Sequence, residues 1–443
     1  MKYNSVMDMV GNTPVLLISP EIHGLKNIDL YAKLEYYNPF GSVKDRIAKG
    51  LLEPYIEEIK KSGKRVIEAS SGNTAKALTA LASVNGIGCR VISSRIKYPE
   101  MRQILQTLGA DIDELPSLSD CPDPFDPNDT LQYTANILKT EPEKYHYTDQ
   151  YYSELNPTTH YRTTGKELVD DLGNVDYFYS FLGTCGSTLG TGRYLREHNP
   201  QLKIYGIVAE AGHNIPGGRN MNELWEVGLY RREHYDDLIT GDTKQAVEGL
   251  LTLNRKCGVM CGPTGGLAYY ATVKHLKTID EELEKSGERK TAVFIACDRV
   301  ELYMSFLKQH APEIFAGATT TKKTVTSLNP EEIATANIIK AEELDDYLAK
   351  KPLVIDIRGN FAYSMGHIPN SINILDEALA IMLESGRAFP DDKTIIITCR
   401  VGDISNRYAA FLKMQGYNAY SLEGGIQAYK KFGGNLEKSA SHG

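Results

Sequence analysis

The sequence lacks any apolar run long enough to cross a bilayer, and Met1–Asn4 leads into mixed polar sequence rather than a signal peptide. These absences predict a cytoplasmic location. The seven cysteines are an odd number without dense spacing, which argues against a secreted disulfide scaffold. The ten histidines show no metal-ligand spacing. Cys257 and Cys261 lack a second ligand pair, so we expect them to pack in a core and expect no metal site.

The sequence also lacks a strong excess of charge. The formal net charge is −8, and acidic and basic residues are mixed along the whole chain, so no basic stripe is present that could bind nucleic acid. Small-molecule chemistry is therefore favoured over membrane or nucleic-acid partners. A length of 443 residues exceeds what one hydrophobic core usually serves, which predicts two or three domains.

Short apolar runs alternate with helical patterns, which predicts an α/β fold with open, mostly parallel sheets. Residues 65–70 and 89–94 read as strands, and 73–85 and 100–108 as helices. Residues 45–62 have helical spacing that Pro54 should interrupt. A long helix is predicted over 265–286. Further strands are expected over 29–35, 177–182, 204–209 and 292–297.

A lapse in the apolar pattern over residues 316–336 predicts a linker. It divides the chain into a first domain over 1–315 and a second, smaller α/β domain over 337–443. The second domain has predicted strands at 353–357 and 394–398.

Residues 38–46 (NPFGSVKDR) form a turn-rich segment that runs into a helix and fixes Lys44 near its start. A lone lysine is more often a solvated surface residue. The next segment lies at a strand-to-helix turn, where hydroxyls and free helix N–H groups can bind a carboxylate, or where a serine can simply cap the helix. This segment comprises Ser70, Ser71, Gly72, Asn73 and Thr74.

Two glycine-rich turns follow later predicted strands. The first could close its backbone amides around a phosphate, and it comprises Gly183, Thr184, Cys185, Gly186 and Ser187. The second, residues 262–266 (GPTGG), places the Thr264 hydroxyl at the mouth of the long helix. By itself the second turn is about equally well explained as an ordinary helix cap.

The order and spacing of these four segments resembles the cysteine synthase and cystathionine β-synthase family of fold type II pyridoxal phosphate enzymes. Residues 11–14 (GNTP), Gln150-Tyr151 and residues 160–165 (HYRTTG) fit the same pattern, over roughly residues 5–310. The resemblance implies that Lys44 forms a Schiff base with pyridoxal 5′-phosphate and later moves the substrate's α-proton. It also implies a homodimer.

The resemblance further assigns cofactor and substrate contacts. Asn73 would contact the cofactor's ring oxygen, residues 183–187 would hold its phosphate, and Thr264 would meet the pyridine nitrogen with a neutral hydroxyl, which suits β-elimination. Substrate carboxylate binding would fall to Ser70, Ser71, Gly72, Thr74 and Gln150. The sequence departs from the family at Cys185 and Ala75, where glycine is common, and over 91–100 at the pocket rim.

The second candidate site is Cys399, which ends the strand predicted over 394–398. It is followed by Arg400, Val401, Gly402, Asp403, Ile404 and Ser405, and then by a helix expected to begin near Asn406. Loop amides and the positive end of that helix would lower the thiol pKa and could cradle a persulfide or its anionic donor. The alternative is a buried cysteine that acts as a small apolar residue.

Asp356, residues 366–369 (GHIP), the Cys399 loop and residues 424–426 (GGI) occur in an order that resembles rhodanese-like domains, over roughly 337–435. The resemblance implies that Cys399 accepts a sulfane sulfur and passes it to a nucleophile. Ile404 stands where an arginine is common, which points to an unusual sulfur donor.

Three functional hypotheses follow. The first is β-replacement, in which O-acetylserine or a related activated serine and sulfide, or sulfur relayed from Cys399, give cysteine. The second is β-elimination from cysteine to pyruvate and sulfide by the same residues. The third is a non-catalytic scaffold that senses an amino acid. Cystathionine formation from serine and homocysteine is a further variant of the first hypothesis.

Overall fold

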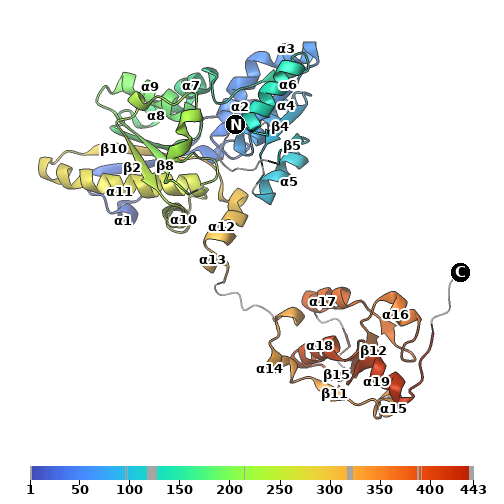
Figure 1. Ribbon diagram of the computed structural model, residues 1–443. Helices are drawn as coiled ribbons and strands as arrows, with labels where there is room; N and C mark the ends of the chain where they lie inside the picture. Colours follow the sequence, from blue (N-terminus) through green and yellow to red (C-terminus); the bar gives the residue numbers. More distant parts are fainter. Residues whose placement is uncertain are drawn as a thin grey trace. The chain divides into compact units, whose positions relative to one another are not determined.

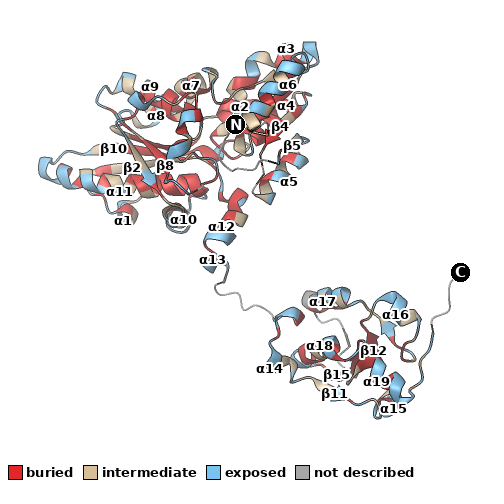
Figure 2. Cartoon of the chain, viewed as in Figure 1, coloured by how far each residue is buried: buried red, intermediate tan, exposed pale blue. Residues whose placement is uncertain are grey.

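The computed structural model describes residues 2–94, 96, 98–116, 126, 128–213, 215–316, 323–386, 389–390 and 392–438. The chain divides into two compact units, Met1–Gly317 and Ala318–Gly443 (Figure 1). In each unit the buried residues gather on the strands and on the inner faces of the helices (Figure 2).

The larger sheet of the first unit has the strand order β1-β2-β10-β7-β8-β9. β1 pairs antiparallel with β2, and the other neighbours are parallel. β2 and β10 are mostly buried, as expected where helices cover both faces of a parallel sheet. The bounds are β1 Val15–Leu17, β2 Ile28–Leu34, β7 Tyr177–Phe181, β8 Lys203–Ala209, β9 Asp237–Gly241 and β10 Lys290–Ala296.

The smaller sheet of the first unit has the order β5-β4-β3-β6, with all neighbours parallel. Its bounds are β3 Arg65–Ala69, β4 Cys89–Ser93, β5 Asp111–Glu114 and β6 Tyr145–Tyr147. α4 (Asn73–Val84) joins β3 to β4, and its Ala- and Leu-rich sequence is buried along most of its length. The strand–helix–strand order predicted for residues 65–94 is therefore confirmed.

The helices of the first unit follow the predicted pattern closely. The predicted run over 45–62 is interrupted as expected, because α2 ends at Leu52, a 3-10 turn spans Glu53–Tyr55 and α3 begins at Ile56. The bounds are α1 Pro20–His23, α2 Lys44–Leu52, α3 Ile56–Ser62, α5 Pro99–Thr107, α6 Thr130–Thr140, α7 Leu155–His160, α8 Lys166–Leu172, α9 Gly186–His198, α10 Thr243–Thr252, α11 Pro263–Ser286, α12 Met304–His310 and α13 Glu313–Ala316.

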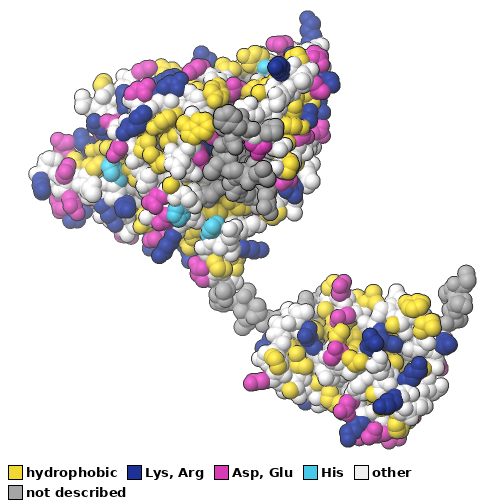
Figure 3. Space-filling model, viewed as in Figure 1, with side chains coloured by type: hydrophobic (Ala, Val, Ile, Leu, Met, Phe, Trp, Pro, Cys, Tyr) yellow, Lys and Arg dark blue, Asp and Glu magenta, His cyan; other side chains and the backbone are white. Residues whose placement is uncertain are grey.

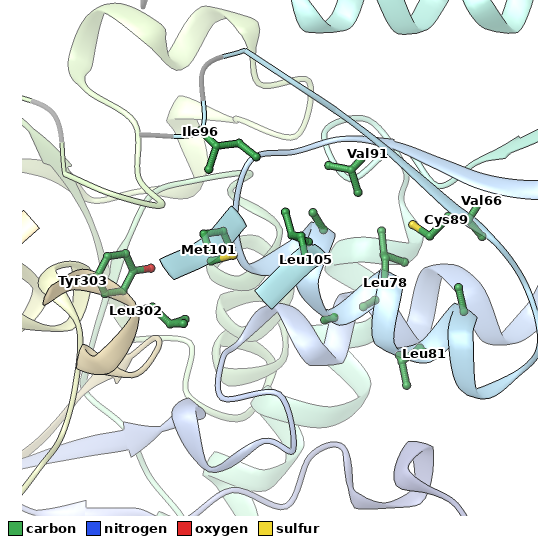
Figure 4. Packing of buried hydrophobic residues seen from close by; sticks show 14 of the residues in the cluster. Val66, Leu78, Leu81, Cys89, Val91, Ile96, Met101, Leu105, Leu302 and Tyr303 are labelled. Atoms are coloured by element: carbon green, nitrogen blue, oxygen red, sulfur yellow. The ribbon is translucent and has the colours of Figure 1, made fainter. Parts of the chain in front are cut away.

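One apolar cluster connects the smaller sheet to the segment after β10. Val66, Leu78 and Val91 from β3, α4 and β4 pack in the same cluster as Met101 of α5 and Tyr303 (Figure 4). Tyr303 ends the short 3-10 helix Val300–Tyr303. Residues that are far apart in the sequence form this cluster, and their packing fixes the position of Tyr303.

The second unit contains one parallel sheet with the order β11-β15-β14-β12-β13. Its strands are β11 Asn337–Ile339, β12 Leu353–Asp356, β13 Ile372–Asn373, β14 Ile395–Thr398 and β15 Ala419–Leu422. Its helices are α14 Pro330–Ile333, α15 Leu344–Leu348, α16 Asn360–Ser364, α17 Asp376–Ser385, α18 Asp403–Met414 and α19 Gly425–Phe432.

Two details of the second unit differ from the sequence-based expectation. Val325 and Leu328 lie in its hydrophobic core, so part of the segment expected as a linker belongs to this unit; residues 317–322 lie outside the described residues. α18 begins at Asp403 rather than near Asn406, because Gly402 takes a left-handed conformation (φ +94°) that turns the chain directly into the helix.

On the faces drawn in Figure 3, acidic and basic side chains are intermingled. Among the helices of the described ranges, none combines the length and the apolar character that a membrane span requires.

Candidate active sites

A cavity of about 290 Å³ lies in the first unit, where several parallel strands of its two sheets end. β3, β4, β7 and β10 all reach its wall at their carboxyl ends. The cavity brings together most of the residues that the sequence predicted. Its lining includes Lys44, Ser70, Ser71, Gly72, Asn73, Thr74, Gln150, Gly183, Thr184, Ser187 and Thr264.

Lys44 is half-buried and begins α2. The loop before it is tied to the end of β10, since the Val43 N–H donates to the Cys297 carbonyl at 2.8 Å. The buried Asp45 carboxylate accepts from the Phe40 N–H at 2.6 Å and from the Ser42 hydroxyl at 3.0 Å. Burial raises the pKa of Asp45 to about 7. These contacts fix the lysine at the cavity wall.

Arg46, two residues after Lys44 in α2, lies in a buried cluster of ion pairs. The Arg46 guanidinium, 1% exposed, donates to Glu35 at 2.6 and 2.8 Å and to Glu167 at 2.6 and 2.7 Å. Lys33 lies 2.9 Å from Glu167, and the Thr13 hydroxyl donates to Glu35 at 2.8 Å. Burial by itself would raise the pKa of Glu167, but Arg46 and Lys33 outweigh it and lower the pKa to about 2.

The turn from β3 to α4 forms one wall of the cavity. The Thr74 hydroxyl donates to the Gln150 side-chain oxygen at 2.6 Å, and the Gln150 amide donates to the Ala69 carbonyl at 3.2 Å. Asn156 donates to the Gln150 carbonyl at 2.8 Å and to the Thr184 hydroxyl at 3.1 Å. Asn156, which no sequence motif marks, therefore connects the predicted carboxylate site to the predicted phosphate loop.

The predicted phosphate loop lies at the start of α9, a helix of 13 residues. Thr184 and Ser187 line the cavity, whereas Cys185 and Gly186 do not. Cys185 adopts φ +64°, and its thiol packs in the apolar core, where burial raises its pKa to about 12. A Cβ at Gly186 would lie 2.0 Å from the Asn156 side-chain oxygen, so this position requires glycine. The cysteine that departs from the family pattern thus leaves the cavity free.

The residues at the cavity fit pyridoxal phosphate. The start of α9 suits an anionic phosphate, and Lys44 shares the cavity with it. Asn73 donates through its side-chain nitrogen to Asp298 at 2.7 Å, whereas its buried oxygen Oδ1 has no hydrogen-bond partner among the described residues. A bound group in the cavity would supply that missing partner.

Four further cavity residues carry charged or hydrogen-bonding side chains, and the sequence motifs did not predict them. They are Arg219, Glu226, Asp298 and Tyr303. Asp298 was within reach of sequence reasoning, because it follows a buried strand whose carboxyl end faces the same edge as the other sites. Arg219 lies in irregular backbone and Glu226 ends the 3-10 helix Met221–Glu226, and no sequence pattern marks either residue.

Arg219 and Glu226 form a charged pair in the cavity wall. The Arg219 guanidinium lies 3.7 Å from the Glu226 carboxylate and donates to the Tyr151 hydroxyl at 3.0 Å. Glu226 is 6% exposed, and neither of its oxygens accepts a hydrogen bond within the described ranges. Burial raises the pKa of Glu226 to about 7, against the opposing charge of Arg219.

Cys261 is buried in the core of the first unit, and Cys257 packs against the same core. Within the part of the chain that the structure describes, no group of three or more histidine, cysteine or acidic side chains is arranged to hold a metal ion.

The second site lies in the loop between β14 and α18. The Cys399 sulfur accepts from the Gly402 N–H at 3.1 Å and from the Ser405 hydroxyl at 3.4 Å. The Asp403 carboxylate lies 3.5 Å from the same sulfur. Arg400, Val401, Asp403 and Ile404 are exposed. The predicted loop therefore surrounds the sulfur, but it also places the Asp403 carboxylate beside the sulfur, a contact that the sequence did not predict.

Close backbone contacts shape this loop. A Cβ at Gly425 would lie 2.4 Å from the Cys399 carbonyl oxygen, so the start of α19 packs directly against the loop. Asp356, at the end of β12, is buried and pairs with Arg358 at 2.6 Å, and Arg358 also donates to the Gly366 carbonyl at 2.7 Å. The start of α19 thus supports the loop directly, and Asp356 lies beside Thr398, the last residue of β14 before Cys399.

Family models match both units, and known proteins match the first. The sequence model of the pyridoxal-phosphate dependent enzyme family matches residues 6–298, and that of the rhodanese-like domain matches residues 340–432. A cysteine synthase of Aquifex aeolicus is 30% identical over 311 residues, which cover 68% of this chain and 90% of that protein. An O-acetylserine dependent cystathionine beta-synthase of Bacillus subtilis is 30% identical over 318 residues, which cover 68% and 95%.

A solved structure agrees with these relatives. The crystal structure of a hydrogen sulfide-producing enzyme of Fusobacterium nucleatum is 27% identical in sequence, superposes with a TM-score of 0.58, and covers 69% of this chain and 99% of that one. The resemblance drawn from the motifs and the expected cofactor are confirmed. The chain belongs to the pyridoxal-phosphate dependent enzyme family and carries a C-terminal rhodanese-like domain.

Proposed function

We propose that the first unit catalyses β-replacement, in which an activated serine such as O-acetylserine reacts with sulfide to give cysteine. One observation carries the proposal: Lys44, the turn at residues 70–74 and the start of α9 line one cavity. This set supplies a lysine, a carboxylate site and a phosphate site together. The name of the Aquifex aeolicus relative points to the same product, and the name of the Bacillus subtilis relative points to the same activated serine.

Each cavity residue has a task in this reaction. Bound pyridoxal phosphate supplies the conjugated ring that accepts the electron pair from the substrate's α-carbon. Lys44 holds the cofactor and moves the α-proton through its Nζ. Residues 70–74 and Gln150 orient the substrate carboxylate. Thr184, Ser187 and the N–H groups at the start of α9 hold the phosphate.

In the second unit, Cys399 accepts a sulfane sulfur. Its thiolate attacks the outer sulfur of a persulfide donor, a new S–S bond forms on Cys399, and the donor leaves as a thiolate. A further thiol must reduce this persulfide before sulfide can serve the first unit. Because Asp403 lies 3.5 Å from the sulfur, we expect the persulfide of an uncharged thiol to be a better donor than dianionic thiosulfate.

A second candidate reaction uses the thiol of an amino acid as the nucleophile and forms a thioether such as cystathionine. The Arg219–Glu226 pair favours it, because a guanidinium and a carboxylate 3.7 Å apart match the two charged ends of a zwitterion. β-Elimination from cysteine requires only Lys44 and the carboxylate site, and the Fusobacterium nucleatum enzyme is described as producing hydrogen sulfide.

Product analysis distinguishes these reactions. The purified chain with pyridoxal phosphate is incubated with O-acetylserine and sulfide, with O-acetylserine and homocysteine, and with cysteine alone. Cysteine from the first mixture at the highest rate supports the proposal. Cystathionine from the second supports the amino-acid nucleophile, and pyruvate and sulfide from the third alone would replace the proposal by elimination. The homodimer and the cytoplasmic location are also part of the proposal, and sedimentation tests the former.

A further inference from the structure

A second cavity, of about 280 Å³, lies in the first unit beside the active-site cavity, and Leu302 lines both. The loop before α2, the helices α4 and α5, and the segment after β10 form its walls. The proposed reaction gives none of its residues a chemical task. They are Asn38, Pro39, Phe40, Gly41, Lys76, Ile104, Arg299, Glu301 and Leu302.

Lys76 brings a buried positive charge to this cavity. It lies in the first turn of α4, two residues after Thr74, and is 5% exposed. Its ammonium group forms no hydrogen bond or ion pair with any residue that the structure describes. Burial acts against the charge and lowers the pKa of Lys76. Because a buried lysine is nearly always paired, a bound anion is the expected partner.

The carboxylate that acts most strongly on Lys76 does not fill this role. Asp45 accepts from the Phe40 N–H at 2.6 Å and from the Ser42 hydroxyl at 3.0 Å, and it does not line the cavity. Its pKa is raised to about 7 by burial, so it is only partly ionised at neutral pH. Asp45 therefore leaves the charge of Lys76 incompletely balanced.

The other charges of the cavity wall cancel each other. Arg299 donates to Glu301 at 2.5 Å, and a Cβ at Gly41 would lie 3.0 Å from the Arg299 Cδ, so the arginine stem packs against the loop. Asp298, the remaining acidic group that acts on Lys76, lines the active-site cavity instead. One positive charge is left in excess, which matches a monoanion better than a dianion.

The rest of the wall is mostly apolar. Pro39, Phe40, Ile104 and Leu302 supply it, and the last three contact or belong to the apolar cluster drawn in part in Figure 4. The side-chain amide of Asn38 already forms hydrogen bonds through both its nitrogen and its oxygen. A matching ligand therefore combines one anionic end with a small apolar body, and the volume suits only a small molecule.

We propose that this cavity binds a small organic monocarboxylate. The carboxylate pairs with Lys76, and the apolar part contacts Phe40 and Leu302. The inference goes beyond the proposed function, because the site is separate from the substrate carboxylate site at residues 70–74. Residues 38–41 belong to this wall and lead to Lys44, so an occupied site stabilises the loop that positions the active-site lysine.

Thermal unfolding of the full chain loaded with pyridoxal phosphate tests the proposal. The loss of the bound cofactor's absorbance reports on the first unit, and butyrate is compared with uncharged butyramide at constant ionic strength. Butyrate should raise the unfolding midpoint, and butyramide should not. Lys76→Met should weaken the apparent affinity for butyrate by about tenfold or more, because the charged partner is lost.

Matched variants separate this cavity from the substrate site. Butyrate bound at residues 70–74 contributes equally in wild type and Lys76→Met, so the difference between them belongs to the second cavity. Lys60→Met, on the exposed face of α3, should keep the wild-type response. Lys76→Met removes a buried charge and should fold at least as stably without ligand. If it does not fold, Lys76→Gln replaces it.

Three results would overturn the inference: no shift with butyrate, an equal shift with butyramide, or equal butyrate responses in wild type and the folded Lys76 variant. Each would leave the proposed β-replacement standing, since that reaction uses the other cavity.

Discussion

The two sites of this chain differ in how far apart in the sequence their residues lie. The cavity of the first unit draws its residues from Lys44 to Tyr303 and from the strand ends of two sheets. The second site is formed by Cys399 and the six residues after it, between one strand and one helix. The first site therefore exists only when distant segments have folded together, whereas the second is determined largely by local backbone.

The buried ion pairs of the two units show the same contrast. Arg46 pairs with Glu167, 121 positions away, and with Glu35. In the second unit, Arg358 pairs with Asp356, two positions before it. A long-range ion pair stabilises the packing of segments that are distant in sequence. A substitution in the Arg46 cluster should therefore lower the unfolding free energy of the first unit more than a substitution in the Arg358–Asp356 pair lowers that of the second.

The largest expected effect is that of Lys44→Ala. Removal of the group that holds the cofactor and moves the α-proton should lower turnover in the first unit by about 10²- to 10⁴-fold or more. The visible absorbance of covalently bound cofactor should disappear, as measured by spectrophotometry. Lys60→Ala, on the exposed face of α3, is the matched control and should behave as the wild type. Unchanged physiological output with Lys44→Ala would instead support a non-catalytic scaffold.

Cys399→Ser distinguishes the activity of the second unit from that of the first. Sulfur transfer from a persulfide donor should fall to background, because serine cannot carry the sulfur, while cysteine formation from O-acetylserine and free sulfide should persist. Both rates are measured on the same preparation, with Cys257→Ser as the control for thiol content. Equal loss of both rates would contradict separate sites.

Glu167→Gln tests the long-range ion cluster. The pKa of Glu167 is about 2 in the folded chain, below its ordinary value, so its charge stabilises the fold above about pH 4.5, and that contribution is lost as the pH falls toward 2. We expect the variant to lower the unfolding free energy of the first unit by about 3 kcal/mol at pH 7. The difference from the wild type should shrink at low pH.

Denaturant unfolding, followed separately for each unit, measures this effect. Glu58→Gln, on an exposed helix face, is the control and should change little. A loss of the same size in the second unit would contradict an effect of this ion cluster on the first unit alone.

Glu68→Gln should have the smallest effect and the opposite sign. Glu68 is fully buried in β3, its Oε2 accepts from the Thr148 hydroxyl, and burial raises its pKa to about 8. The folded chain then keeps a proton that the unfolded chain releases, so stability falls as the pH rises from about 4.5 to 8. The neutral variant should gain about 1–3 kcal/mol at pH 8 and little at pH 5. Thermal unfolding at both pH values measures this, and a gain at pH 5 as large as that at pH 8 would contradict it.

The sequence predicted the strand–helix order around Lys44 and residues 65–94 well, because apolar periodicity and the effect of Pro54 act locally. It missed Asn156, Arg219 and Asp298, whose importance depends on partners in other elements. The helix after Cys399 was predicted to begin near Asn406. It begins at Asp403, because Gly402 adopts a left-handed conformation. The sequence also did not predict that the carboxylate of Asp403 lies beside the sulfur.

The sequence by itself determined the residue types of both sites, the cofactor class and the presence of two α/β units, because motif spacing and apolar patterns are encoded along the chain. Only the tertiary structure decided that Cys185 packs in the core, that Asn156 connects two loops, and that the Asp298 carboxylate accepts a hydrogen bond from the Thr264 hydroxyl. The physical reason is that the direction of a hydrogen bond depends on which groups folding brings within reach, and sequence spacing does not contain that information.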